Sequence, residues 1–209
     1  LRASAKNYND VYVLTDPEQY NQFLDRDRKE LASEAFKITS SYDSMISTWF
    51  DNNTVTRSYN KEFPLKYGCN PYQNNASVLS IDKLPFSVIN GNPGYINLLD
   101  AINAWNLVSE VRLSLDIDCA ASFKHVSPAG VAIAENILDA YKNARNCDPK
   151  CSFGDFIAVN GNVTVELAEY IKTQVTDGII APSYSLKALD ILKTKKNGKF
   201  IILEGNDID

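Results

Sequence analysis

The single histidine of the chain, His125, directly follows Lys124 in the stretch SFKHVSPAG at 122–130. Imidazole titrates at about pH 6.5, so it can take a proton from a weak nucleophile at neutral pH. The neighbouring ammonium favours the neutral imidazole and can also stabilise an oxyanion that develops on an attacked carbonyl. Such a pair is typical of acyl or formyl transfer, although two ordinary loop residues could have the same spacing.

Two further motifs offer groups for binding a ligand. Lys66 and Tyr67, in KYGCNPYQ, provide a cation and a hydroxyl that suit a phosphate or a carboxylate, although no Walker or G-x-G-x-x-G pattern accompanies them. Phe153 and Gly154, in SFGDF, provide a stacking face and a position where a backbone can approach closely. A core aromatic beside a turn is the alternative interpretation of Phe153.

Three polar turns follow short apolar runs that read as buried strands. They contribute Lys124 with His125, Asn90 with Gly91, and Asp177. In open α/β sheets, ligands bind in the crevice beyond the carboxyl ends of the strands. We therefore expect these five residues near one edge of a sheet, with ordinary loop roles as the alternative for Asn90 and Gly91.

Hydrophobic periodicity predicts the elements that position these residues. Apolar side chains at three- and four-residue steps predict a helix over 28–50, and the polar stretch 51–62 is the expected domain boundary. Strands are predicted at 11–16, 76–81, 86–89, 119–123, 156–159, 178–182 and 199–203, and helices at 97–115, 130–145, 164–175 and 185–196. Strands that alternate with helices predict an α/β fold with a largely parallel sheet.

Composition argues against several kinds of partner. The net charge is −5, and the longest basic cluster, Lys193, Lys195, Lys196 and Lys199, is expected to be a solvated turn, so no nucleic acid partner is predicted. No apolar stretch approaches the ~18–20 residues of a membrane span, so no membrane partner is predicted either. The sequence lacks an initiator Met, which suggests numbering that begins inside a longer protein.

The cysteines and the missing motifs exclude further chemistries. Four scattered cysteines, Cys69, Cys119, Cys147 and Cys151, fit the reduced thiols of a cytoplasmic protein. No metal is expected, because the CDPKC pair lacks companion ligands and the His-x-Glu and Pro-Cys-x-x-Cys patterns of zinc deaminases are absent. A hydrolase triad is not expected either, since no G-x-S-x-G motif occurs.

Several motifs together resemble a known family. KYGCNPYQ, NGNPGYINLLDAINAWNLV, ASFKHVSPAGVA, SFGDF and VTDGIIAPSY occur in the order found in the transformylase region of the AICAR transformylase/IMP cyclohydrolase family. The opening LRASAKNY resembles the end of that family's cyclohydrolase domain. The resemblance covers nearly the whole chain.

The resemblance implies an activity and site residues. Members transfer a formyl group from the co-substrate 10-formyltetrahydrofolate to AICAR, giving FAICAR, and then close the ring to IMP in purine biosynthesis. By resemblance, His125 is the proton acceptor, Lys124 stabilises the transition state, and Lys6 is the cyclohydrolase lysine. The implied nucleotide contacts are Lys66, Tyr67, Gly154 and Asp177, with Asn90, Gly91 and Phe153 close by.

The resemblance also implies an organisation. Residues 1–27 would end a methylglyoxal-synthase-like cyclohydrolase domain, 28–62 would be a linker, and 63–209 would form the first cytidine-deaminase-like α/β unit, without zinc. The family builds its sites across a homodimer, and most of the folate pocket belongs to a second unit outside this chain. The alternative is therefore a catalytically incomplete fragment or paralogue that binds AICAR or a related purine nucleotide.

Within the motifs that carry the resemblance, the chain departs from the family pattern at Lys66, Tyr72 and Tyr8. Lys66 stands where arginine is usual, so a bidentate grip on phosphate becomes a point-charge contact. Tyr72 stands where a histidine is common, and Tyr8 replaces the last histidine of the opening motif.

Overall fold

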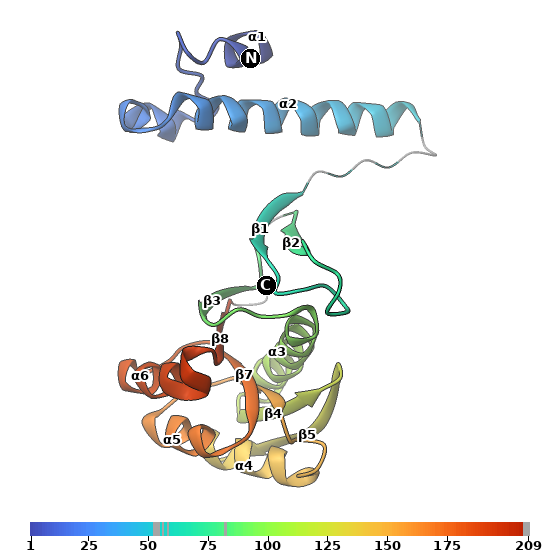
Figure 1. The fold of residues 1–209 in the computed structure, drawn as a ribbon, viewed down its shortest axis with the longest axis vertical. Helices are drawn as coiled ribbons and strands as arrows, with labels where there is room; N and C mark the ends of the chain where they lie inside the picture. The colour runs from blue at the N-terminus through green and yellow to red at the C-terminus, as the bar shows by residue number, and fades with distance from the viewer. Residues whose placement is uncertain (52–54, 56, 58, 82, 207–209) are drawn as a thin grey trace. The chain divides into compact units, whose positions relative to one another are not determined.

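The computed structural model describes residues 1–51, 55, 57, 59–81 and 83–206. Its contacts divide the chain into two compact units, Leu1–Asn60 and Lys61–Asp209 (Figure 1). No helix in the described part of the chain is long and apolar enough to cross a membrane.

The first unit is helical. It contains α1 (Arg2–Lys6), the short 3-10 helices η1 (Pro17–Asn21) and η2 (Phe23–Asp25), and the long α2 (Arg28–Phe50), which has the predicted bounds. Asp27 starts α2 by accepting a hydrogen bond from the Lys29 N–H at 2.8 Å. A small core holds the unit together and consists of Ala5, Val13, Ala32 and Ala35, with Tyr8 packed against them.

One expectation for this unit needs correction. Residues 11–16 form no strand, because the Gln19 side chain accepts the N–H groups of Thr15 and Asp16 and draws this segment into the cap of η1. The apolar stripe of α2 is buried only in its first turns. Farther along the helix its members are exposed, namely Ile38, Tyr42, Met45, Ile46, Trp49 and Phe50.

The second unit is built on a six-stranded sheet in the order β3-β8-β7-β6-β4-β5. Its strands are β3 (Phe86–Asn90), β4 (Asp118–Lys124), β5 (Ser127–Ala134), β6 (Asp155–Val159), β7 (Thr176–Ala181) and β8 (Ile201–Gly205). A separate two-stranded sheet joins β1 (Asn60–Pro64) to β2 (Ser77–Ser80).

Helices cover both faces of the six-stranded sheet. Alternate residues of β6 show this, since Phe156 and Ala158 pack in the core with α3 (Tyr95–Leu115), whereas Ile157 and Val159 pack in the opposite core. That second core is completed by α4 (Ile137–Cys147), α5 (Val165–Thr173) and α6 (Leu186–Thr194), and η3 (Lys195–Gly198) follows α6. The unit is therefore an α/β structure with a central sheet.

The prediction of a largely parallel sheet is wrong. Only β6 with β7 and β7 with β8 pair in parallel, while β3 with β8, β4 with β6, and β4 with β5 are antiparallel. Residues 130–134 were expected to start a helix but belong to β5, which returns along β4 in a hairpin. The helix begins only at Ile137, where the Asn136 side chain accepts the Asp139 N–H at 2.9 Å.

The mixed sheet determines which strand ends meet. Because β4 is antiparallel to β6, and β3 is antiparallel to β8, the carboxyl ends of β3 and β4 lie at the same edge as the amino ends of β6, β7 and β8. This edge carries most of the candidate residues of the second unit.

Candidate active site

Lys124 and His125 lie at the hairpin turn between β4 and β5. Lys124 pairs with Ser127, so His125 and Val126 are the two central residues of the turn. Their φ angles are 55° and 63°, in the left-handed region that favours asparagine and glycine. An irregularity in the register between Ser122 and Phe123 bends the hairpin just before the turn.

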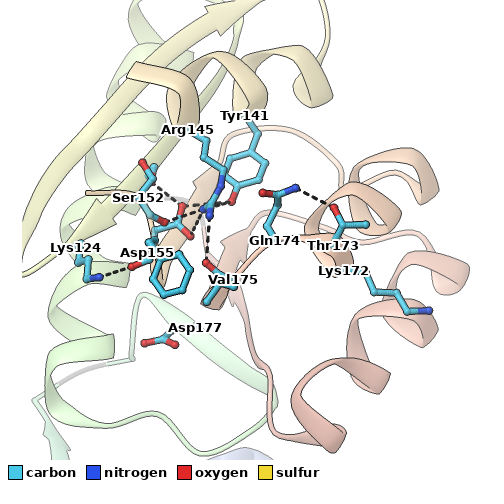
Figure 2. Close-up of polar contacts among 12 residues, drawn as sticks. Lys124, Tyr141, Arg145, Ser152, Asp155, Lys172, Thr173, Gln174, Val175 and Asp177 are labelled. Atoms are coloured by element: carbon cyan, nitrogen blue, oxygen red, sulfur yellow. Dashed lines mark hydrogen bonds and ion pairs between the residues drawn. The ribbon is translucent and has the colours of Figure 1, made fainter. Parts of the chain in front are cut away.

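The ammonium of Lys124 reaches the loop that precedes β6. It donates a hydrogen bond to the main-chain carbonyl oxygen of Phe153, which is the dashed line that starts at Lys124 in Figure 2. Gly154 has a φ of 77°, and a Cβ there would lie 3.6 Å from the Lys124 nitrogen. Phe153 is 59% exposed, so it is not a core aromatic. These contacts hold Lys124, Phe153 and Gly154 together at one edge of the sheet.

Asp100 lies behind the turn, on the buried face of α3, and sequence analysis did not select it. It is 6% exposed, and its Oδ1 accepts a hydrogen bond from the Val126 N–H at 2.6 Å. Burial raises the pKa of this carboxyl, with an addition from Asp177, and the Val126 hydrogen bond and the charges of His125 and Lys124 oppose the rise. The spacing of Asp100 could have indicated a buried carboxyl, since it lies at four-residue steps from Ala104 and Val108, which are buried on the same helix face.

A buried polar network supports the loop 148–154 from below. Arg145 Nη1 lies 2.9 Å from Asp155 Oδ1 and donates to the Ser152 carbonyl at 2.8 Å (Figure 2). The Tyr141 and Ser122 hydroxyls donate to Asp155 Oδ2 at 3.3 and 2.6 Å. Burial raises the pKa of Asp155, against the effect of these partners.

The same network extends to the start of β7. Arg145 Nη2 donates to the Val175 carbonyl at 3.3 Å, and the Gly154 N–H donates to the same oxygen at 2.8 Å. It therefore joins the loop that carries Phe153 and Gly154 to the segment that leads into Asp177. Sequence analysis missed Arg145 and Asp155, whose partners lie on different elements.

Four of the predicted ligand residues line one cavity of about 610 Å³: Lys66, Tyr67, Gly91 and Asp177. Gly91 has a φ of 81°, and a Cβ there would meet the Phe200 carbonyl oxygen at 2.8 Å. Asn90 does not line this cavity. Its amide donates to the Gly198 and Phe200 carbonyls at 3.1 and 2.7 Å, which fixes the end of β3.

The lysine cluster at 193–199 is a solvated turn, as the sequence predicted, since Lys193, Lys196 and Lys199 are exposed around η3. Lys196 and Lys199 both line the cavity, and Lys196 forms an ion pair with Asp177. Positive φ values at Lys196, Asn197 and Gly198 bend this segment back toward the sheet edge. The cavity thus has three lysines and one carboxylate, a composition that suits an anion.

Lys124 and His125 line a separate cavity of about 360 Å³, together with Ser127, Pro128, Ala129, Lys150 and Cys151. The structure therefore places the predicted catalytic pair and most of the predicted nucleotide contacts in two cavities of the second unit. Lys6 is the exposed last residue of α1 in the first unit.

The described residues contain no group of three or more His, Cys, Asp or Glu side chains that could hold a metal ion. All four cysteines are free thiols, and burial raises the pKa of Cys119 to about 11.

Comparison with known proteins gives consistent matches. Residues 4–208 match the family model described as AICARFT/IMPCHase bienzyme. The bifunctional purine biosynthesis protein PurH of Clostridium botulinum (strain Kyoto / Type A2) is 37% identical over 223 residues, which cover 98% of this chain and 44% of that protein. The PurH protein of Petrotoga mobilis is 34% identical over 233 residues, which cover 100% of this chain and 45% of that protein. The chain spans less than half the length of these curated relatives.

Proposed function

The chain belongs to the AICARFT/IMPCHase bienzyme family, and from that premise we propose that it contributes to formyl transfer from 10-formyltetrahydrofolate to AICAR, giving FAICAR in purine biosynthesis. The observation that carries the proposal is the position of Lys124 and His125. They occupy a fixed hairpin turn beside a cavity, and Lys124 is tied to the loop that bears Phe153 and Gly154.

In this proposal the two side chains divide the chemistry. The 5-amino group of AICAR is a poor nucleophile, because its lone pair is delocalised into the imidazole ring. As its nitrogen bonds to the formyl carbon, His125 accepts the amine proton, and the Lys124 ammonium stabilises the oxyanion. An ammonium has three donors, so its bond to Phe153 leaves two for the oxyanion. The carbonyl then re-forms, and N10 of tetrahydrofolate leaves with a proton returned by the imidazolium.

The larger cavity is the proposed nucleotide site. A phosphomonoester carries close to two negative charges at neutral pH, and Lys66, Lys196 and Lys199 together exceed the charge of Asp177 by two. Lys66 contacts the phosphate as a point charge in this proposal, and Gly91 leaves room for close approach of the nucleotide.

The co-substrate fits this chain only in part. The Lys124 ammonium suits the formyl oxygen, and the exposed Phe153 ring nearby suits an aromatic part of the folate. When bound, 10-formyltetrahydrofolate supplies the formyl group. The remaining folate contacts are assigned to parts of the protein outside these residues, and no metal has a role in the proposal.

The wider organisation follows the family. We assign 63–209 to a cytidine-deaminase-like unit, 28–62 to a linker, and 1–27 to the end of a methylglyoxal-synthase-like domain in which Lys6 serves the ring closure to IMP. We also propose a homodimer in the cytoplasm with sites shared across the interface. The exposed apolar side chains of α2 support an assembly that covers them.

A nucleotide-binding fragment without catalysis is the second candidate. The observation in its favour is coverage, because the chain spans less than half of its curated relatives. Calorimetry of this polypeptide separates the two readings. Binding of AICAR without binding of a folate would favour the fragment.

The test of the main proposal is formyl transfer by the full-length native protein, followed as FAICAR formation from AICAR and 10-formyltetrahydrofolate. Lys124→Ala should lower kcat by about 100-fold or more through loss of oxyanion stabilisation. Lys187→Ala, on the exposed side of α6, is the control and should leave kcat unchanged. Absence of FAICAR with the unaltered protein would refute the proposal.

A further inference from the structure

The turn that carries His125 has a backbone conformation that its own residues do not favour. Both central residues, His125 and Val126, have positive φ. Two-residue turns of this kind usually contain asparagine or aspartate followed by glycine, because these residues adopt positive φ most easily. Histidine tolerates the region, whereas a β-branched valine is an outlier there. The sequence of the turn therefore does not explain its conformation, and a contact from another element must hold it.

Asp100 supplies that contact from α3. Its buried carboxylate accepts the Val126 N–H at 2.6 Å, and the helix that carries it packs directly on β4. Lys124 and His125, the candidate catalytic residues, favour the charged form of this carboxyl and so lower its pKa, whereas Asp177 raises that pKa. Asp100 therefore holds the backbone of the turn that follows Lys124 and contains His125.

A simple hairpin would not require this arrangement. Glycine in place of Val126 would close the same turn without strain and without a buried carboxylate. Backbone strain that the surrounding structure maintains is typical of functional sites, where it preorganises side chains. The contact between Asp100 and Val126 is thus explained by what the turn presents rather than by closure of the hairpin.

We propose that Asp100 is a positioning residue, which holds the His125–Val126 turn through the Val126 N–H and so fixes the direction of the His125 imidazole and the Lys124 ammonium. The inference rests on the proposed function, because formyl transfer is the step that needs both groups in fixed positions. Asp100 lines neither of the two cavities, so in this proposal it acts through the turn and not by direct contact with a ligand.

The first test uses three variants of the full-length protein. Asp100→Ala removes the acceptor, Asp100→Asn keeps a carbonyl acceptor but removes the charge, and Glu110→Ala changes an exposed carboxylate of the same helix. Asp100→Ala should lower kcat about 10- to 100-fold and change KM for AICAR by less than about threefold, since displacement of a catalytic group affects the reaction step. Asp100→Asn should retain more activity than Asp100→Ala, and Glu110→Ala should match the unaltered protein.

The second test is rescue. Val126→Gly lets the turn adopt positive φ without help, so the double variant of Asp100→Ala with Val126→Gly should regain about 10-fold or more in kcat over Asp100→Ala alone. Hydrogen exchange of the residue 126 amide provides a readout that is independent of activity. This amide should be protected in the unaltered protein and should lose protection in Asp100→Ala.

The outcomes separate this inference from the proposed function. A kcat of Asp100→Ala within about threefold of the unaltered protein would overturn the inference, as would a loss that follows a fall in Tm and is not relieved by Val126→Gly. If Asp100→Ala does not fold, Asp100→Leu fills the same space without an acceptor and takes its place. If the unaltered protein makes no FAICAR, the proposed function fails, and amide exchange still decides whether Asp100 holds the turn.

Discussion

Arg145 and Asp155 form a buried ion pair, with Nη1 and Oδ1 2.9 Å apart and side-chain exposures of 9% and 0%. The pair stands beneath the loop 148–154 and is joined by Ser122, Tyr141 and Ser152. Because every main partner is buried, its two charges depend on one another and cannot be compensated by water.

Removal of one member of this pair should destabilise the protein strongly. Arg145→Met leaves the Asp155 carboxylate without its cation, and we expect a loss of about 3–5 kcal/mol in the free energy of unfolding. The double variant of Arg145→Met with Asp155→Leu should lose less than Arg145→Met alone, because no charge remains unpaired. Urea unfolding curves measure both values, and a double variant that is less stable than Arg145→Met would contradict this account of the pair.

Asp100 should make stability depend on pH in a defined direction. Its pKa in the folded protein lies above the ordinary 3.8, chiefly because of burial, so the native state holds this proton more tightly than the unfolded chain. The contribution of this carboxyl to the free energy of unfolding is complete below its pKa in the unfolded chain. It is lost as the pH rises through its higher pKa in the folded protein. The stability of the unaltered protein minus that of Asp100→Asn should therefore fall across this window. Urea unfolding over a pH series checks it, and a difference that rises with pH would be the opposite of what we expect.

Lys66 should control affinity for the nucleotide rather than the chemical step. Lys66→Arg restores a bidentate donor and should tighten AICAR binding about three- to tenfold, whereas Lys66→Ala should weaken it about 10-fold or more. Calorimetry with AICAR measures both effects, with Lys187→Ala as the exposed control. Equal affinity in Lys66→Ala and the unaltered protein would remove Lys66 from the nucleotide site.

Gly91 and Gly198 have the same φ of 81°, so substitutions there distinguish the cost of backbone strain from the cost of a steric clash. A Cβ at Gly198 has the Lys193 carbonyl 3.8 Å away as its nearest neighbour, whereas a Cβ at Gly91 meets Phe200 O at 2.8 Å and Ile201 Cα at 3.0 Å. We expect Gly198→Ala to cost about 1 kcal/mol of stability and Gly91→Ala about 2–4 kcal/mol, because backbone must also move. Equal losses in thermal or urea unfolding would show that the close approach at Gly91 has no energetic weight.

Local sequence was informative where one element determines its own structure. The 3.6-residue period predicts a helix from Arg28 to Phe50, and α2 has these bounds. The same reasoning failed at 130–134, since its small apolar residues fit a helix until β4 is available as a partner. It failed at 11–16 because side-chain caps occupy the backbone donors that a strand would use.

The sequence correctly predicted that Lys124, Asn90 and Asp177 lie at one edge of the sheet, but for the wrong reason. We expected Lys124, Asn90 and Asp177 to follow strands that run in parallel. In the structure Lys124 and Asn90 end their strands, whereas Asp177 is the second residue of β7, and antiparallel pairing brings these opposite ends to one edge. Strand direction depends on long-range pairing, which a short apolar run does not encode.

The residues that the sequence did not reveal act through partners far along the chain. Asp100 bonds Val126, Arg145 bonds Val175, and Lys196 pairs with Asp177. Each of these residues looks ordinary alone, as a helix carboxylate, a helix cation or one lysine in a basic run. Their contributions appear only when the sheet order and the left-handed turns are known.

The central claim, that His125 accepts the proton during formyl transfer, is tested most directly by the kcat of His125→Ala in the full-length protein. Amide exchange and Tm should first show that the variant keeps the fold. The account predicts a fall in kcat of about 100-fold or more for FAICAR formation, with AICAR affinity nearly unchanged, because a general base contributes this much to the reaction step. A kcat within about tenfold of the unaltered protein would contradict the assignment of His125 as the base.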